Sequence, residues 1–431
     1  MRTAIDLAKW MVAAVLAAVP VVASAASDPD AVAKALEQMN RRLDQLEERN
    51  QQLTMRVDEL TRQNETLRAA NPAPQPPVAV PPAAAAAAPR DEWESRIKLG
   101  GDFRFRHENT RNELLADDRT RESIRARLNA AIKVNDKIRG EIGIATGGRD
   151  PRSANASLGE AEARKDIGLD LGYMTWQPLD TLSLTAGKMR EPYVRPGRSQ
   201  FFDIEIRPEG LALNYKDGRG LFGTAFNFWL EERAVQADSM LRGGQVGWDG
   251  TLGVAKLKAG IGYWDFHKVR GRFPGFGNGI LNELGNSIVG TGANARYLYD
   301  YDIGQVFAET TVPVASIPLT LFADYGHNYQ AGNGLDTAYS VGFVIGKASK
   351  IGQWEAGVLK QKVEKDALFA QWTDSEFAGG VTDNDGYAWR VSWMAMQSLL
   401  VTANYYDTQF NVDVGNEAHF DRWQLEFSFT F

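Results

Sequence analysis

FDRWQLEFSFTF, residues 420–431, alternates between large apolar and polar side chains. The apolar set is Trp423, Leu425, Phe427, Phe429 and Phe431, and polar or charged residues stand between them. Because successive side chains of a strand point to opposite faces, this period of two predicts a strand with one apolar and one polar face. Such a strand suits a wall between hydrocarbon and a water-filled lumen. The plainer interpretation is an edge strand of a soluble sheet.

The same alternation recurs throughout residues 93–431 and decides between these interpretations. Residues 124–134, for example, place Ile, Leu, Ala and Val on one parity and Arg125, Arg127 and Lys133 on the other. A soluble sheet with one parity so consistently apolar would expose far too much apolar surface. A propeller should show repeats of about 40–50 residues, which the sequence lacks. The alternation therefore favours a transmembrane barrel.

The connections between these segments alternate between long, polar stretches and short turns. The long ones lie near 108–120, 147–165, 190–208, 232–241, 267–303, 330–336, 365–385 and 410–419. The short ones lie near Asn135, Leu179, Asp217-Gly218, Asp249-Gly250, Ser316, Ser349 and Gln397. Residues 291–303, with three tyrosines, are assigned to a long loop or to the extended start of the next strand. The pattern predicts an all-β membrane fold, a 16-stranded antiparallel transmembrane β-barrel with both ends on the short-turn side.

The N-terminal region predicts export. Arg2 and Lys9 lie in a short charged region at the N-terminus, and residues 11–22, which follow it, are mostly apolar. Ala23-Ser24-Ala25 then offers small residues for cleavage. Residues 1–25 are therefore predicted to be a signal peptide. Nothing later supplies the roughly 18 uninterrupted apolar residues of a membrane-crossing helix. The chain has no cysteine, which excludes disulfides and thiolate metal sites.

A heptad pattern follows and predicts a coiled-coil stalk over residues 26–70, joined to the barrel by a Pro/Ala-rich linker over 71–92. Seam asparagines favour dimers in parallel coils, which conflicts with the trimer implied below. The residues at the first seam position are Leu36, Leu43, Asn50, Val57 and Asn64.

Four stretches carry a family resemblance: RTRESIRARLNAAIKVNDKIRGEIGIATGG (119–148), RKDIGLDLGYMTWQP (164–178), LTAGKMREPYV (184–194) and RPEGLALNY (207–215). In order and spacing they resemble the putative-porin family of Gram-negative bacteria. The resemblance implies a 16-stranded, trimeric pore in the outer membrane, in contact with lipid and lipopolysaccharide, with the coiled coil in the periplasm. The terminal aromatics Phe427, Phe429 and Phe431 resemble the signal that the barrel-assembly machinery reads. Peptidoglycan is a further candidate partner of the stalk, and no nucleic-acid partner is expected.

The polar parity of the first three strands is strongly basic and is predicted to line the pore. Its members are Arg104, Arg106, Arg125, Arg127, Lys133 and Arg139. They either set selectivity or simply solvate the lumen, with acidic partners such as Asp102 and Glu141.

The third long loop is the candidate constriction, by analogy with the general trimeric porins, whose third loop folds into the channel. An ordinary surface loop that meets a neighbouring subunit is the alternative. Its charged residues are Arg195, Arg198, Asp203, Glu205 and Arg207, with Phe201 and Phe202 as apolar anchors.

No catalytic, cofactor or metal site is predicted. The histidines, His107, His267, His327 and His419, stand in no recognisable nucleophile or metal motif, and residues 383–386 suit a turn better than a calcium loop. The predicted function is therefore an outer-membrane porin, a passive diffusion channel for small hydrophilic solutes or ions, rather than an enzyme. The alternatives are a tether between outer membrane and cell wall that uses the stalk, and an anion-selective channel that uses the arginines.

Overall fold

The computed structural model describes residues 96–234, 236–275 and 282–431, together with five helical residues, Gln52, Met55, Glu59, Arg62 and Gln63. The chain divides into two units, Met1–Ala88 and Pro89–Phe431. In the first unit, Gln63 Nε2 donates a hydrogen bond of 2.9 Å to Glu59 Oε1. The predicted signal peptide and linker, and the seam residues Leu36, Leu43, Asn50, Val57 and Asn64, lie outside the described residues.

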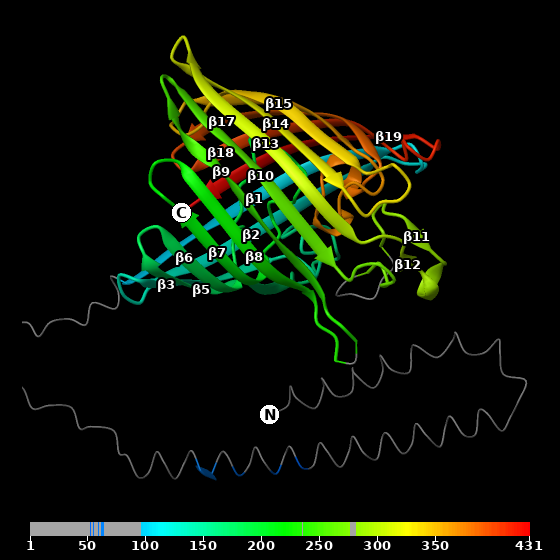
Figure 1. Ribbon diagram of the computed structural model, residues 1–431, viewed down its shortest axis with the longest axis horizontal. Coiled ribbons are helices and arrows are strands. Elements are labelled where there is room, and N and C mark those ends of the chain that lie inside the picture. The colour runs from blue at the N-terminus through cyan, green and yellow to red at the C-terminus, as the bar shows by residue number, and fades with distance from the viewer. Residues whose placement is uncertain are drawn as a thin grey trace, which may run out of the picture. The chain divides into compact units, whose positions relative to one another are not determined.

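Residues of the second unit form a closed antiparallel β-barrel (Figure 1). Its sheet contains 17 strands, and one of them, β4 (Ala156–Ser157), is a two-residue piece beside the wall, which leaves sixteen strands in the wall itself. These are β1 (Ile97–Asn112), β2 (Arg119–Lys133), β3 (Ile138–Thr146), β5 (Ile167–Leu179), β6 (Leu182–Lys188), β7 (Glu209–Lys216), β8 (Leu221–Glu231), β9 (Ser239–Leu252), β10 (Ala255–His267), β13 (Tyr301–Val314), β14 (Ile317–Asn328), β15 (Thr337–Gly346), β16 (Trp354–Val363), β17 (Asn384–Met396), β18 (Leu399–Phe410) and β19 (Ala418–Thr430). The predicted strand number is confirmed.

The remaining elements lie in the long loops. The fifth loop contains β11 (Ile288–Val289), η2 (Gly292–Asn294) and β12 (Arg296–Tyr297), where β11 and β12 form a small ribbon of their own. The seventh loop contains η3 (Ala370–Trp372) and η4 (Phe377–Gly380). None of the helical segments among the described residues has the length and apolarity needed to cross a membrane.

The terminal strand closes the barrel. Strand β1 pairs with β2 on one side and with β19 on the other, so that Phe105 lies opposite both Ile124 and Phe427. The backbone of Phe431 exchanges two hydrogen bonds with Gly101, of 3.0 and 3.1 Å. The C-terminus lies at the end of the barrel opposite β11 and β12 in Figure 1.

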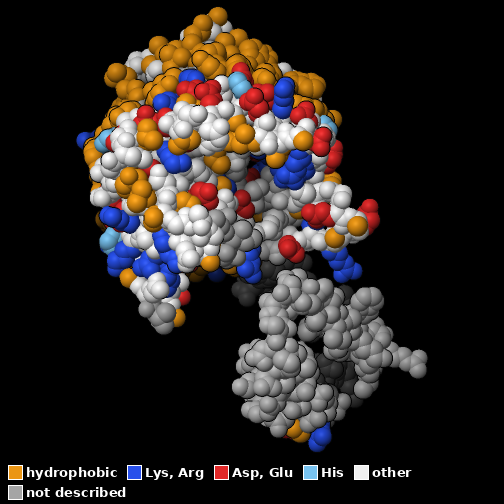
Figure 2. Space-filling view, turned by 90° about the vertical axis from the view of Figure 1, so that its right-hand side faces the viewer, with side chains coloured by type: hydrophobic (Ala, Val, Ile, Leu, Met, Phe, Trp, Pro, Cys, Tyr) orange, Lys and Arg blue, Asp and Glu red, His pale blue; other side chains and the backbone are white. Residues whose placement is uncertain are grey.

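Side chains follow the predicted parity on β19. Trp423, Phe427 and Phe429 are 39–45% exposed on the outside, whereas Gln424 and Glu426 are buried inside the barrel. A sheet that is apolar outside and polar inside matches the requirement of a lipid-facing barrel wall. Figure 2 shows charged side chains of both signs on the face at the right of Figure 1, with hydrophobic side chains gathered above them.

Three details of the predicted connections are settled by the strand register. The turn predicted at residues 383–386 is wrong for its last three residues, which lie in β17 and pair with β16. The turn predicted at Asp249-Gly250 is wrong, because both residues lie within β9 and pair with Lys258 and Leu257 of β10. The chain instead turns at residues 253–254, where Gly253 has φ 61°, a conformation that glycine adopts at little cost. The assignment of residues 291–303 is confirmed, since β12 belongs to the fifth loop and β13 begins at Tyr301.

The barrel seam should tolerate no side chain at Gly101. A Cβ there would lie 2.2 Å from the backbone oxygen of Arg127 and 2.8 Å from Cζ of Phe431. We expect Gly101→Ala to destabilise the folded barrel by about 1–3 kcal/mol, the usual range for overpacking. The measurement is the temperature at which the protein loses its heat-modifiable gel mobility. Gly168→Ala is the control, because a Cβ at Gly168 meets nothing within 4 Å, and an equal loss in both variants would contradict the seam's role.

Candidate functional site: the lumen between the third loop and the arginine wall

Four arginines form a continuous basic wall inside the barrel. Arg104 and Arg106 lie on β1, and Arg125 and Arg127 lie on β2, with Arg104 directly opposite Arg125 in the ladder. All four line a central cavity of about 990 Å³. We call these four residues the arginine wall. Lys133 and Arg139 lie nearer the short-turn end and line a second cavity of about 980 Å³.

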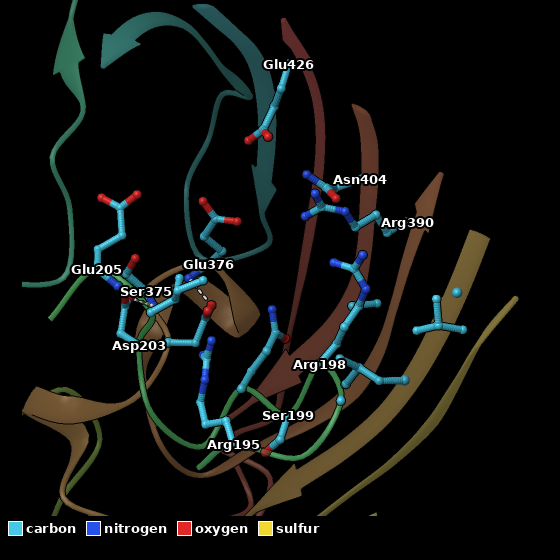
Figure 3. Close-up of a pocket in the computed structure, with 18 of the residues that line it drawn as sticks. Arg195, Arg198, Ser199, Asp203, Glu205, Ser375, Glu376, Arg390, Asn404 and Glu426 are labelled. Carbon is cyan, nitrogen blue, oxygen red and sulfur yellow. Dashed lines mark hydrogen bonds between the residues drawn. The ribbon is translucent and has the colours of Figure 1, made fainter. Parts of the chain in front are cut away.

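The third long loop, residues 189–208, lies against the central cavity. All five of its predicted residues line this cavity: Arg195, Arg198, Asp203, Glu205 and Arg207. In Figure 3, Glu205 and Glu376 lie at the left of the cavity and Arg198 and Arg390 at the right. The loop therefore places charges of both signs inside the barrel.

Glu205 joins the third loop to the arginine wall. Its carboxylate oxygens lie 2.5 Å from Arg125, 3.3 Å from Arg127 and 3.7 Å from Arg104. One oxygen also accepts a 2.7 Å hydrogen bond from the backbone N–H of Ala154 in the second long loop. A single buried carboxylate thus offsets the mutual repulsion of three arginines and fixes two loops to the wall.

The seventh long loop, residues 364–383, supplies a second acidic group to the wall. Glu376 lies 2.5 Å from Arg106 and accepts a 2.9 Å hydrogen bond from the hydroxyl of Tyr406. From β19, Glu426 lies 2.5 Å from Arg106 and 3.6 Å from Arg104. The arginine wall is therefore paired with carboxylates along its whole height.

The sequence predicted one of the two named acidic partners. Asp102 lies 2.6 Å from Arg125, as expected. Glu141 does not pair with the wall, because it binds Arg190 at 2.5 Å and accepts a 2.6 Å hydrogen bond from Tyr173. Glu426 could have been found from the inward parity of the terminal strand. No pattern in the sequence signals Glu376, because it belongs to an irregular loop.

An aromatic core fixes the third and seventh loops to the opposite side of the barrel. Phe202 of the third loop packs on Trp264 of β10, with ring centroids 4.3 Å apart. Trp372 and Phe369 of the seventh loop contact Phe266 of β10, with centroids 5.7 and 4.9 Å apart. These side chains are buried in one cluster that also contains residues of β8, β9 and β13. The inward wall near β8, β9, β10 and β13 is thus apolar and covered by these loops, and the arginine wall lines the central cavity.

Carboxylates also join the two loops to each other. Asp203 Oδ2 accepts a 2.9 Å hydrogen bond from the backbone N–H of Ser375, and Asp203 Oδ1 accepts one of 2.7 Å from Glu205 N–H. Burial, and then the neighbouring Asp374, hold the pKa of Asp203 well above its ordinary value. Burial, and then Glu376, raise the pKa of Asp374 to about 6.

The pKa values of Glu205 and Glu376 are lowered, in contrast to those of Asp203 and Asp374. Burial opposes ionisation of Glu205, but Arg125, Arg127 and Arg104 outweigh burial and lower its pKa to about 2. For Glu376, burial is likewise outweighed by Arg106 and Arg104, and its pKa is about 2. The two pairs of carboxyl groups therefore respond to pH with opposite signs.

We expect the loops to be held most firmly between about pH 4.5 and 6. The raised pKa of Asp374 gives stability that is complete below its ordinary 3.8 and is lost as the pH rises through about 6. The lowered pKa of Glu205 gives stability that is complete above its ordinary 4.5 and is lost as the pH falls toward about 2. The measurement is thermal unfolding at several pH values. Asp374→Asn should reduce the loss of stability on the alkaline side, to which Asp203 still contributes, and should leave the acid side unchanged. An unchanged profile in that variant would contradict the assignment.

The described residues contain no candidate metal site. Across residues 96–234, 236–275 and 282–431, no group of three or more His, Cys, Asp or Glu side chains could hold a metal ion. His107 and His327 each lie near one carboxylate, Glu122 at 2.9 Å and Asp336 at 3.4 Å.

Comparison with known proteins gives a family match over part of the chain and a similar fold. Residues 111–276 match the model of a family described as "Putative porin", which confirms the resemblance seen in the sequence. The structure is similar to OprB of Pseudomonas putida at high pH, with 14% identity, a TM-score of 0.55 and coverage of 79% of this chain and 95% of that chain. OmpF of Salmonella typhi in complex with daunomycin has 12% identity, coverage of 78% and 97%, and a TM-score of 0.47. No curated protein matches the sequence significantly.

Proposed function

We propose that this chain is an outer-membrane porin, a passive diffusion channel for small hydrophilic solutes and ions. The observation that carries the proposal is the charged cavity of about 990 Å³ inside a closed sixteen-stranded barrel. The family match over residues 111–276 and the porin-like fold support a channel in the outer membrane rather than an enzyme.

The third loop is proposed to form the constriction with the arginine wall. Charges held on both sides of a narrow passage order water and favour small polar solutes over bulky apolar ones. Because the wall is paired with Glu205, Glu376 and Glu426, its excess positive charge is small. This pairing speaks against the anion-selective alternative in the form that depends on the arginine wall.

Assembly and the N-terminal region extend the proposal. A homotrimer follows from the family resemblance, and the lipid-facing wall would contact outer-membrane lipid and lipopolysaccharide. The terminal aromatics, which lie at the barrel seam, would be read by the barrel-assembly machinery. The periplasmic coiled coil and a tether to peptidoglycan rest on the heptad pattern alone, so the tether remains a sequence-based prediction.

The test is conductance of the purified protein in a planar bilayer under a salt gradient. A porin of this kind should give large, steady current steps, in groups of three if the pores are trimeric. Its reversal potential should show weak ion selectivity, because the wall is neutralised. Well-folded, heat-modifiable protein that conducts no current would overturn the proposal. Deleting residues 32–67 should leave the conductance unchanged if the stalk only tethers the barrel.

A further inference from the structure

Arg390 differs from every other cationic side chain of the central cavity. It lies on β17, lines the cavity, and donates from Nε to Ser392 Oγ on its own strand at 3.2 Å. Among the described residues, no carboxylate oxygen lies within 4.0 Å of its guanidinium group. Each of the other arginines and lysines that line the cavity has a carboxylate within that distance.

Arg198 of the third loop adds a second positive charge at the same place. Its guanidinium group binds Glu355 of β16, and its side chain lines the same cavity. Burial, and then the charge of Arg390, lower the pKa of Arg198 to about 10. Figure 3 shows the two side chains reaching the same side of the cavity from the loop and from the barrel wall. Two guanidinium groups therefore lie on the same side of the cavity, and only that of Arg198 is paired with a carboxylate.

Part of the cavity surface near this pair is apolar, although Asn404, which lies opposite Arg390 in the ladder, is polar. Val344, Leu359 and Ala388, from β15, β16 and β17, line the cavity, and each is no more than 9% exposed. Ala388 is two residues from Arg390 on the same inward parity of β17. A solute held at Arg390 would thus meet charge at one end and a hydrocarbon surface at the other.

We propose that Arg390, together with Arg198, binds the carboxylate of small organic acids as they pass through the pore. This inference rests on the proposed porin function and assigns a solute class to its constriction. A guanidinium group presents two parallel N–H donors that match a carboxylate, and the planar geometry distinguishes arginine from lysine. The apolar surface favours an organic acid, whose hydrocarbon part can contact it. An inorganic anion has no such part.

The site also suits a channel because its affinity is limited. Glu355 already neutralises Arg198, so a solute gains the full attraction of one arginine and only part of the other. Conduction requires binding that is strong enough to attract a solute and weak enough to release it.

The test uses benzoate as the probe and the full-length protein in planar bilayers. We expect benzoate to interrupt the chloride current in a concentration-dependent way, and neutral benzamide to have no such effect. Arg390→Gln should raise the benzoate concentration needed by at least about tenfold, the expected loss of a charge-assisted hydrogen-bonding pair. Arg390→Lys keeps the positive charge but loses the two parallel N–H donors of the guanidinium group. This variant should show an intermediate loss of benzoate sensitivity. Inorganic phosphate that interrupts the current as strongly as benzoate would overturn the assignment to organic acids.

Two control variants separate a site from general electrostatics. Lys258→Gln removes a cation from the same cavity, where Lys258 is already paired with Glu309 at 3.3 Å, and should keep most of the benzoate effect. Arg219→Gln removes an exposed cation from a short turn that does not line the cavity. An equal loss in Lys258→Gln and Arg390→Gln would overturn the proposal.

A calorimetric titration of the detergent-solubilised, heat-modifiable protein with benzoate tests the site independently of conductance. Binding by the wild type that is lost in Arg390→Gln supports the site even if no current is seen, in which case the porin function alone fails. Current without benzoate binding would overturn the site and leave the porin function in place.

Discussion

Glu205→Gln is expected to release the third loop from the arginine wall and to shift the ion selectivity of the pore toward anions. The substitution removes the negative charge shared by Arg104, Arg125 and Arg127, and it leaves three largely buried guanidinium groups with fewer partners. Removing one member of a buried ion pair costs about 3–5 kcal/mol, and we expect the lower end here because the cavity admits water. The measurements are the reversal potential under a salt gradient and the thermal unfolding temperature.

The matched control is Glu209→Gln at the base of the same loop. Glu209 pairs with Lys188 at 2.7 Å, but its side chain is 59% exposed, and exposed pairs contribute little to stability. A reversal potential and unfolding temperature that change equally little in both variants would show that Glu205 does not hold the loop.

Phe202→Ala is expected to loosen the third loop from the other side. Phe202 is 1% exposed and packs between Trp264 and Tyr193, with ring centroids 4.3 and 6.0 Å away. Truncating a buried phenylalanine costs about 3–5 kcal/mol through lost burial and the cavity left behind. Because the loop borders the cavity, the pore should also become noisier and more conductive, which single-channel recording measures directly.

Ile204→Ala is the control for this second prediction. Ile204 belongs to the same loop, but it is 57% exposed, so its truncation removes little packing. Conductance noise that rises to the same extent in both variants would mean that the aromatic core does not position the loop.

The barrel was predictable because its determinants are local. The alternation at Phe427, Phe429 and Phe431 follows from the two-residue period of a strand alone. In the structure these three side chains are exposed, as predicted. Two wrong turns show the limit of this reasoning. Residues 384–386 suggest a turn by composition, but they begin β17 and pair with β16. Asp249-Gly250 has the composition of a turn, but β9 and β10 remain paired beyond it until Gly253. Residue type alone did not reveal where pairing ends.

The partners of the site were not predictable in the same way. Arg106 and Glu426 are 320 residues apart in the sequence, and they meet only because β1 and β19 close the barrel. The position of Glu376 depends on an irregular loop held by aromatic packing, which follows no period. Parity could place the arginines on the inside, but it could not say which carboxylates approach them or that Arg390 would have none.

The most direct measurement of the central claim is thiol accessibility in a conducting bilayer, since the wild-type chain contains no cysteine. Ser428 of β19 lines the cavity beside the arginine wall, whereas its neighbour Phe427 points outward and is 39% exposed. If solutes pass between the third loop and this wall, a charged, water-soluble thiol reagent should reduce the current through Ser428→Cys in discrete steps and leave that through Phe427→Cys unchanged. Unaltered current in Ser428→Cys, with the cysteine shown to be modified, would contradict a pore at this place.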